Sequence, residues 1–152
     1  MQGIKLLVMA MTVASLTASL AAQDDEFEAQ KALVEYFRAW NAEDNEAIAK
    51  ASNFPRLSLG SNGQVIVRAS PEDITTDFEG LRQGEGWNRT TLDLFEAVQV
   101  SVDKVHFKVV FSRRYEDGTT YRTVPALYVI TRQNGHWGLQ LQSLLPATFV
   151  AQ

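Results

Sequence analysis

Cysteine is absent from this chain of 152 residues, which excludes a disulfide framework, a thiol nucleophile and a lipid anchor on cysteine. Histidine is nearly absent, and the two that occur, His106 and His136, do not have the spacing of metal ligands. The glycine-flanked serine of hydrolases and the glycine-rich phosphate loop are missing as well. From these absences we expect neither a metal site nor a bound cofactor.

Positive charge is also in short supply. Lys and Arg number 14 against 18 Asp and Glu, which gives a net charge of −4. The basic residues are scattered, and the short Ser112–Arg114 stretch is too small to neutralise a run of phosphates. We therefore expect no nucleic-acid partner.

Long apolar runs are missing except at the N-terminus. Lys5 is the only charged residue before Asp24, and residues 6–20 are rich in leucine, valine, alanine and methionine. This run is short of the ~20 apolar residues that a membrane-spanning helix needs. Its length and the positive charge before it are instead typical of a secretory signal peptide.

Small residues follow the apolar run at the spacing that signal peptidases recognise. Ser19 and Ala21 fit this pattern, with cleavage after Ala21 or Ala22. We predict a signal peptide at residues 1–21 and a single domain at residues 22–152, exported to the periplasm or secreted. After cleavage the mature domain would have no membrane segment. The alternative is that the N-terminal run forms a buried helix.

Helical periodicity characterises the first part of the predicted domain. Residues 24–44 begin with acidic residues that suit a helix N-terminus, and apolar residues then recur at intervals of three, four and seven. Asp44 or Asn45 can cap a second, short helix that ends near Ala51. Ser70-Pro71, followed by two acidic residues, predicts the start of a third helix that runs to residues 84–86.

Strand patterns with a period of two dominate the rest of the chain. Two short strands flank a turn at residues 61–63. From Thr90 onward the pattern predicts four long strands joined by tight turns at Asp117-Gly118 and Asn134-Gly135, with bounds of 90–101, 104–115, 120–132 and 136–145. Helices followed by a long antiparallel meander predict an α+β fold in which the helices cover one face of the sheet.

Alternation along these strands assigns each side chain to one face of the sheet. The face expected to lie under the helices is nearly all apolar: Leu92, Leu94, Glu96, Val98, Val100, Val105, Phe107, Val109, Phe111, Val124, Ala126, Tyr128, Ile130, Trp137, Leu139 and Leu141. The outer face is mixed: Asp93, Phe95, Ala97, Gln99, Ser101, His106, Lys108, Val110, Ser112, Leu127, Val129, Gln140 and Gln142.

The outer face is too apolar for a surface that contacts only water, which is typical of a protein interface. We predict a homodimer packed sheet to sheet. The candidate interface residues are His106, Phe95, Gln99, Leu127, Val129, Gln140 and Gln142. In this interpretation His106 is an interface histidine rather than a catalyst.

Several stretches resemble the nuclear transport factor 2-like superfamily, and within it the uncharacterised SnoaL-like proteins. They are "YFRAWNAEDNEAIA", "NFPRLSLGSNG", "EGWNRT", "DKVHF", "YEDGT" and "LYVITRQNGHWGLQLQS". The resemblance covers the chain from about residue 26 to residue 146. The resemblance implies a cone: a curved antiparallel sheet, built from the four-strand meander and the short N-terminal hairpin, wraps around about three helices and an apolar pocket. It also implies dimers that form through the convex face. It does not specify an activity, because the superfamily includes enzymes, binding modules and scaffolds.

The inner face supplies the candidate pocket residues. They are Glu96, Tyr128, Tyr36, Trp40, Trp137 and Ser143. Glu96 is the one carboxylate on this face and could act as a general base, with Tyr128 or Tyr36 as a hydrogen-bond donor. The simpler interpretation is that the aromatics are ordinary core and that Glu96 lies at the pocket mouth or pairs with an arginine.

Two functions therefore remain open from the sequence, with a third behind them. The first is an exported protein that binds a small apolar or amphipathic molecule, or serves as a scaffold. The second is a cofactor-independent isomerase, lyase or hydrolase that uses Glu96 as base and Tyr128 or Tyr36 as donor. The third is a protein-interaction module that uses the outer sheet face.

Overall fold

The structure is a computed structural model that describes the backbone of residues 3–149 and the side chains of residues 22–149. Its helical elements are α1 (Gly3–Asn41), α2 (Asn45–Lys50), a 3-10 turn η1 (Pro71–Asp73) and α3 (Phe78–Glu85). Its strands are β1 (Ser52–Leu59), β2 (Val65–Arg68), β3 (Arg89–Ser101), β4 (Lys104–Arg114), β5 (Thr120–Gln133), β6 (His136–Leu144) and β7 (Thr148–Phe149).

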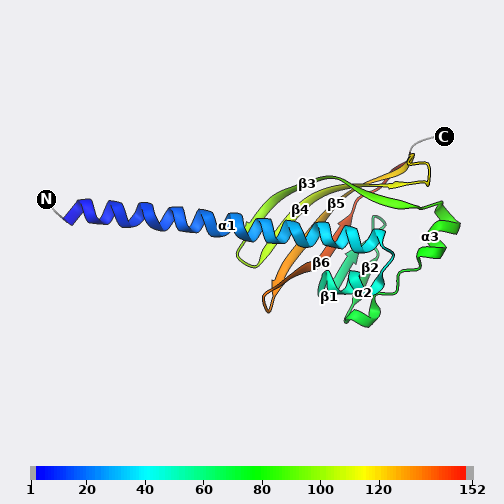
Figure 1. The fold of residues 1–152 in the computed structure, drawn as a ribbon, viewed down its shortest axis with the longest axis horizontal. Helices are drawn as coiled ribbons and strands as arrows, with labels where there is room; N and C mark the ends of the chain where they lie inside the picture. Colours follow the sequence, from blue (N-terminus) through cyan, green and yellow to red (C-terminus); the bar gives the residue numbers. More distant parts are fainter. Residues whose placement is uncertain (1–2, 150–152) are drawn as a thin grey trace.

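Helix α1 is much longer than the helix predicted from Asp24 onward. It is continuous over 39 residues, and its N-terminal part extends as a rod beyond the edge of the sheet (Figure 1). This rod contains the predicted signal peptide, whose side chains lie outside the described residues, and cleavage after Ala21 stays a prediction. Within the part of the chain that the structure describes, no helix combines the length and the hydropathy needed to cross a membrane.

The second helix and the first hairpin are confirmed. Asp44 caps α2, since its carboxylate accepts a hydrogen bond of 3.0 Å from the Ala47 amide. The two short strands β1 and β2 pair antiparallel on either side of the predicted turn, where Gly63 has the positive φ of 82° that favours glycine.

The prediction of a helix that starts at Ser70-Pro71 is wrong in its extent. Those residues start only the 3-10 turn η1, and α3 begins at Phe78 with Asp77 as its cap. The intervening segment is held extended because its backbone pairs with a side chain of α2: the Thr76 amide donates to Asn45 Oδ1 at 3.0 Å, and Asn45 Nδ2 donates to the Thr76 carbonyl at 3.1 Å. Ile74, buried in the interior, also fixes this segment.

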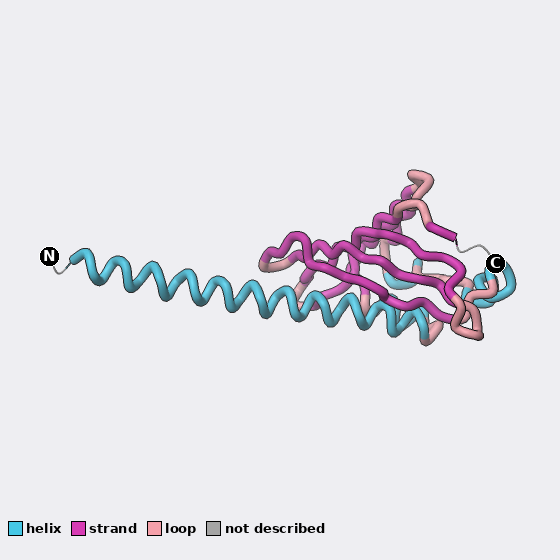
Figure 2. Tube along the Cα trace, turned by 90° about the horizontal axis from the view of Figure 1, so that it is seen from above, coloured by secondary structure: helices cyan, strands magenta, loops and turns pink. Residues whose placement is uncertain are grey.

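The strands form one curled, open sheet in the order β2-β1-β6-β5-β4-β3, with β7 paired to β5. Helix α1 packs against β3, β5 and β6 and lies along one side of the sheet (Figure 2). The predicted α+β cone is confirmed, as are the four long strands to within two residues at each end. One pairing differs from the predicted antiparallel sheet, because β1 and β6 run parallel and the sheet is therefore mixed.

A bulge in β3 inverts part of the predicted face assignment. Leu92 pairs with Phe111 and Leu94 with Val110, so Asp93 is an extra residue, and the side chains of Thr91 and Ser112 donate to its carboxylate. The inversion continues to a second shift between Ala97 and Gln99. Residues between the two shifts therefore face the opposite side of the sheet from the one that alternation predicts.

Glu96 and Phe95 exchange the faces that alternation gave them. Glu96 pairs with Lys108 and is exposed on the outer face, not in the pocket. Phe95 turns inward, where its ring contacts that of the buried Phe107 at a centroid distance of 6.4 Å, so it is not an interface residue. Leu94 and Val98 turn outward, 45% and 47% exposed.

A second bulge, in β6, has the same effect on the last strand. Val129 pairs with Leu141 and Ile130 with Leu139, which makes Gln140 the extra residue. Gln142 therefore lies opposite the buried Tyr128 and faces inward, contrary to its assignment to the dimer interface. Ser143 lies opposite Leu127 on the outer face, contrary to its assignment to the pocket.

Ala97 also leaves the outer face, because it lies opposite the buried Phe107. The remaining candidates for the dimer interface agree with the register. His106 lies opposite Gln99 on one side and Val129 on the other, and Leu127 follows on the same face. Gln140 bonds the side chain of Thr131, whose Oγ1 donates to Gln140 Oε1 at 2.8 Å. The use of this face as a dimer interface stays a prediction.

Candidate functional site

The interior of the cone holds a cavity of two adjoining chambers between α1 and the sheet. The inner chamber has a volume of about 60 Å³ and is lined by Tyr36, Phe37, Trp40, Thr90, Phe111, Arg113, Tyr128, Gln142 and Leu144. The outer chamber has a volume of about 280 Å³ and is lined by Tyr36, Trp40, Arg56, Arg68, Ile74, Thr76, Asp77, Leu81, Arg113 and Gln142. Four lining residues are common to both, so the chambers form one site.

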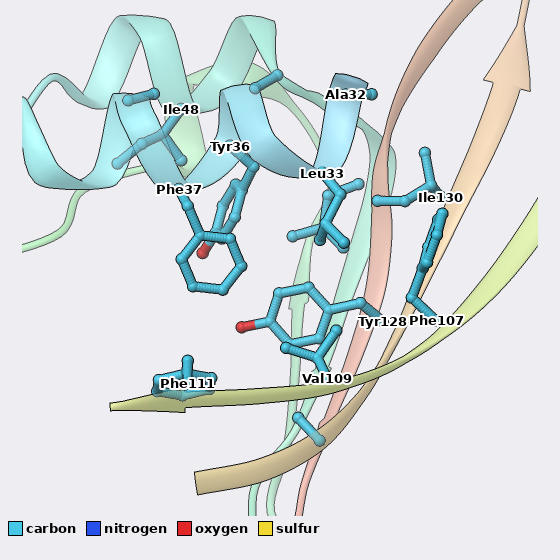
Figure 3. Packing of buried hydrophobic residues seen from close by; sticks show 14 of the residues in the cluster. Ala32, Leu33, Tyr36, Phe37, Ile48, Phe107, Val109, Phe111, Tyr128 and Ile130 are labelled. Atoms are coloured by element: carbon cyan, nitrogen blue, oxygen red, sulfur yellow. The ribbon is translucent and has the colours of Figure 1, made fainter. Parts of the chain in front are cut away.

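Aromatic rings form the inner wall of this cavity. Tyr36 and Trp40 are one turn apart on α1 and present their rings to the same side. The ring of Phe37 stacks on that of Tyr128 at 5.8 Å and 16° (Figure 3). Burial, and then the neighbouring Tyr36, raise the pKa of Tyr128 well above its usual value, so its hydroxyl stays protonated and can donate a hydrogen bond.

Arg56 is the central polar residue of the outer chamber. It is only 4% exposed, and its guanidinium donates to the Tyr36 hydroxyl at 2.9 Å, to Gln142 Oε1 at 2.9 Å and to Ser52 Oγ at 3.3 Å. The guanidinium carbon also lies 4.8 Å from the centroid of the Tyr36 ring. Its Nε has no hydrogen-bond partner in the described part of the chain.

A second arginine lies beside the first. Arg68 of β2 is the register partner of Arg56 of β1, so both project from adjacent positions of one hairpin. Arg68 Nη1 donates to Ser58 Oγ at 3.3 Å. Burial, followed by the positive charge of Arg56, lowers the pKa of Arg68. The hairpin thus concentrates positive charge at the cavity wall.

The third arginine of the cavity has its charge balanced by Glu85. Arg113 Nη1 lies 2.5 Å from Glu85 Oε2, Arg122 Nη1 lies 3.4 Å from Glu85 Oε1, and the Tyr121 hydroxyl donates to Glu85 Oε2 at 3.1 Å. Burial alone would raise the pKa of Glu85, but the hydrogen bond and charge of Arg113, with Tyr121 and Arg122, lower it overall. Burial and the charge of Glu85 raise the pKa of Tyr121 to about 12.

Asp77 is the one carboxylate among the residues that line the two chambers. Its Oδ1 accepts a hydrogen bond of 2.8 Å from the Gly80 amide, and it caps α3 in this position. This hydrogen bond fixes the carboxylate at the start of α3.

The structure brings together half of the predicted pocket residues. Tyr36, Trp40 and Tyr128 line the cavity, and Gln142 joins them from the outer-face set. Trp137 lies elsewhere, in an open groove between α1 and the β5–β6 turn that also contains Phe27 and His136. The groove is bordered by charged side chains of α1, and the Trp137 ring is covered by Arg132 at 5.5 Å.

The three cavity arginines carried no motif in the sequence. Arg56 and Arg68 lie in short strands whose alternation does not indicate which face is buried. Arg113 belongs to the basic stretch at residues 112–114, which is too small to bind nucleic acid. The signal in the sequence is a charged residue within or at the end of a short apolar strand, as in "FPRLSL" and "VIVRAS". Such a residue is costly to bury and usually has a specific partner.

The curled sheet, the helix against it and the cavity between them define a cone-shaped α+β protein. The chain belongs to the family described as NTF2-like protein (DUF6841), whose model matches residues 24–140. This confirms the superfamily recognised in the sequence, while membership of the SnoaL-like subgroup stays a prediction. The comparison with curated proteins found no match.

Solved structures share the fold at low sequence identity. An NTF2-like protein with a cystatin-like fold from Novosphingobium aromaticivorans has a TM-score of 0.69 and 14% identity, over 87% of this chain and 88% of that one. A ketosteroid isomerase-like protein from Erwinia carotovora atroseptica has a TM-score of 0.57 and 15% identity, over 78% and 92%. A hexachlorocyclohexane dehydrochlorinase has a TM-score of 0.57 and 14% identity, over 88% and 93%. At these identities the likeness extends to the fold alone.

Proposed function

We propose that this protein binds a small amphipathic molecule in the two-chambered cavity. The observation that carries the proposal is the composition of the cavity wall: stacked aromatic rings on one side and hydrogen-bond donors on the other. A few polar groups that converge on an otherwise apolar enclosure are typical of small-molecule sites. The volume of about 280 Å³ for the outer chamber is sufficient for a compact ligand with one ring.

Binding is better supported than acid–base catalysis. Glu96 was the proposed general base of an isomerase, lyase or hydrolase, and it is exposed on the opposite face of the sheet from Tyr36 and Tyr128. Asp77, the carboxylate that does line the cavity, is held as the cap of α3. A general base must reach the proton that it removes, and neither group has both the position and the freedom to do so.

We also propose that the mature protein begins after residue 21 or 22 and acts outside the cytoplasm. The projection of the N-terminal part of α1 beyond the sheet supports this, because removal of that segment would leave the cavity walls in place (Figure 1). Mass spectrometry of the full chain expressed in a bacterial host tests it. A periplasmic product that starts at residue 22 or 23 is expected, and an uncleaved product that stays in the cytoplasm would contradict it.

The binding proposal is tested by closing the outer chamber. Ile74→Trp fills it with a larger side chain, while Leu59→Trp adds the same side chain at an exposed position of β1. Isothermal titration calorimetry with trans-cinnamate and trans-cinnamamide should show binding to the unmodified protein and to Leu59→Trp but not to Ile74→Trp. Circular dichroism checks that both variants are folded. Binding that survives in a folded Ile74→Trp protein would refute the assignment of the cavity as the site.

A further inference from the structure

The least expected feature of the cavity is a pair of arginines without an acidic partner. Within residues 22–149, six arginines lie within 4.0 Å of a carboxylate, whereas Arg56, Arg68 and Arg89 do not. Arg89 is exposed to solvent, but Arg56 is buried and Arg68 is partly buried at the cavity wall. Both instead donate to neutral oxygens of Ser, Tyr and Gln side chains. Buried charges are normally paired, so this arrangement calls for a counter-charge.

The free-energy cost of burying these arginines is increased because their two positive charges are adjacent. Arg56 and Arg68 are cross-strand partners, and like charges directly opposite one another repel. The neutral acceptors offset only part of the lost hydration, and the buried Nε of Arg56 has no acceptor at all among the described residues. The buried Trp40 Nε1, on the wall shared by both chambers, is likewise without an acceptor. Two buried donors of residues at this wall, Arg56 Nε and Trp40 Nε1, therefore lack an acceptor among the described residues.

The nearby acidic residues offset this imbalance only in part, since Asp73 attracts Arg68 through its charge but forms no ion pair with it. Asp77 lines the same chamber but is bonded to the Gly80 amide. Asp73 is bonded to the amides of Ala69 and Ser70 at 2.8 and 3.1 Å. Each carboxylate thus stabilises a turn or a helix start, and neither lies within ion-pair distance of the two arginines.

We propose that Arg56 and Arg68 bind the carboxylate of a small organic acid, whose apolar part lies against Tyr36 and Trp40. This rests on the proposed function, since it assigns the chemical class of the ligand in the same cavity. The planar guanidinium donates two parallel hydrogen bonds to a carboxylate, which suits two arginines that project from neighbouring strands. Asp77 on the wall disfavours a second negative charge, so a monoanion fits better than a phosphate dianion.

The test compares ligands that differ only in charge, on the full mature domain. The probes are trans-cinnamate, its neutral amide trans-cinnamamide, and phenyl phosphate, each titrated by calorimetry. The variant is Arg68→Gln, because Arg56 joins three side chains of the interior and its removal would also disturb the fold. The matched control is Arg38→Gln, which removes the same charge from a side chain of α1 that is 77% exposed.

We expect cinnamate to bind at least tenfold more tightly than cinnamamide, because a hydrogen bond between charged groups is stronger than one to a neutral acceptor. Cinnamate should also bind more tightly than phenyl phosphate, because Asp77 on the wall disfavours a second negative charge. Arg68→Gln should weaken cinnamate about tenfold or more and leave cinnamamide unchanged, and Arg38→Gln should change neither. Equal binding of acid and amide would overturn the inference but leave the proposed function intact. Tighter binding of phenyl phosphate would overturn the choice of a carboxylate. Binding of no probe would overturn both.

Discussion

Gln142 of β6 accepts a hydrogen bond of 2.9 Å from Arg56 of β1, and the two residues join the strands that form the only parallel pair among the paired strands described. Gln142 also lies directly opposite the buried Tyr128. Among the described residues, Arg56 donates only to neutral oxygens, and the amide oxygen of Gln142 is one of the two at 2.9 Å. A substitution at Gln142 can therefore measure how much a negative charge beside Arg56 stabilises the protein.

Gln142→Glu replaces the amide oxygen by a carboxylate of nearly the same shape. If Arg56 lacks a counter-charge, the substitution should raise the free energy of unfolding by about 1–3 kcal/mol at neutral pH. It should also abolish binding of cinnamate, since the site would then hold an internal anion. Urea denaturation measures the first effect and calorimetry the second.

Gln140→Glu is the matched control for this substitution, because Gln140 is the bulge residue of the same strand and bonds to Thr131 on the outer face. It should leave both quantities nearly unchanged. A destabilised Gln142→Glu protein would show that Arg56 is satisfied by its neutral partners and has no need of an anion.

Because of the bulge at Asp93, we expect substitutions at two neighbouring residues to differ in their effect on stability. Phe95 packs on Phe107 inside the cone, so Phe95→Ala should lower the free energy of unfolding by about 2–4 kcal/mol. Glu96 is exposed opposite Lys108, so Glu96→Ala should change it by less than about 1 kcal/mol. Urea denaturation of both variants tests this register. The reverse order of the two effects would mean that β3 alternates without the bulge.

Alternation and turn chemistry predict most of this fold, and the two bulges account for most of what they miss. The turns at Gly118 and at Asn134-Gly135 have the positive φ angles that their residue types indicate, so the long strands are placed correctly. One extra residue then moves every following side chain to the other face. This single effect misplaced Glu96, Phe95, Gln142 and Ser143.

The signals for the bulges are weak in the sequence. The side chains of Thr91 and Ser112 donate hydrogen bonds to Asp93. Ser112 belongs to the neighbouring strand, so its contact with Asp93 forms only once the two strands have paired. The pairing of β1 with β6 joins residues far apart in the chain, so no local pattern places Arg56 beside Gln142. The positions of Tyr36, Trp40 and Tyr128 on the cavity wall could be predicted, because the periods of a helix and of a strand can be read from neighbouring residues in the sequence.

The cluster around Glu85 should make stability depend on acid pH. The pKa of Glu85 is lower in the folded protein than the ordinary value of 4.5, so the folded state favours its ionised form. Its contribution is therefore fully present above pH 4.5 and is lost as the pH falls toward and below the folded value. The charged and titratable groups that face it are Arg113, Arg122 and Tyr121.

Glu85→Gln keeps the shape of the side chain and removes its charge. The variant should be less stable than the unmodified protein at pH 7, and the difference should shrink as the pH falls below 4.5. Thermal unfolding between pH 3 and 7 measures the difference, with Glu116→Gln, at an exposed position of the turn before β5, as the control. A difference that stays constant over this range would show that Glu85 contributes by packing and not by charge.

The outer face of the sheet is where we expect two copies of the chain to meet. The bulges add the exposed Leu94 and Val98 to a face that already presents Leu127 and Val129. Glu96 and Lys108 lie side by side on the same face, so a two-fold arrangement can set each beside its opposite in the partner.

Leu127→Lys puts a charge in the middle of this face and should dissociate the dimer, because an unpaired charge buried in an interface is costly. Light scattering coupled to gel filtration should give twice the chain mass for the unmodified protein and the single-chain mass for Leu127→Lys. Val65→Lys, on β2 at the far edge of the sheet and 59% exposed, should remain dimeric. A monomeric mass for the unmodified protein at every concentration tested would leave this face open for a different protein partner and would refute the homodimer.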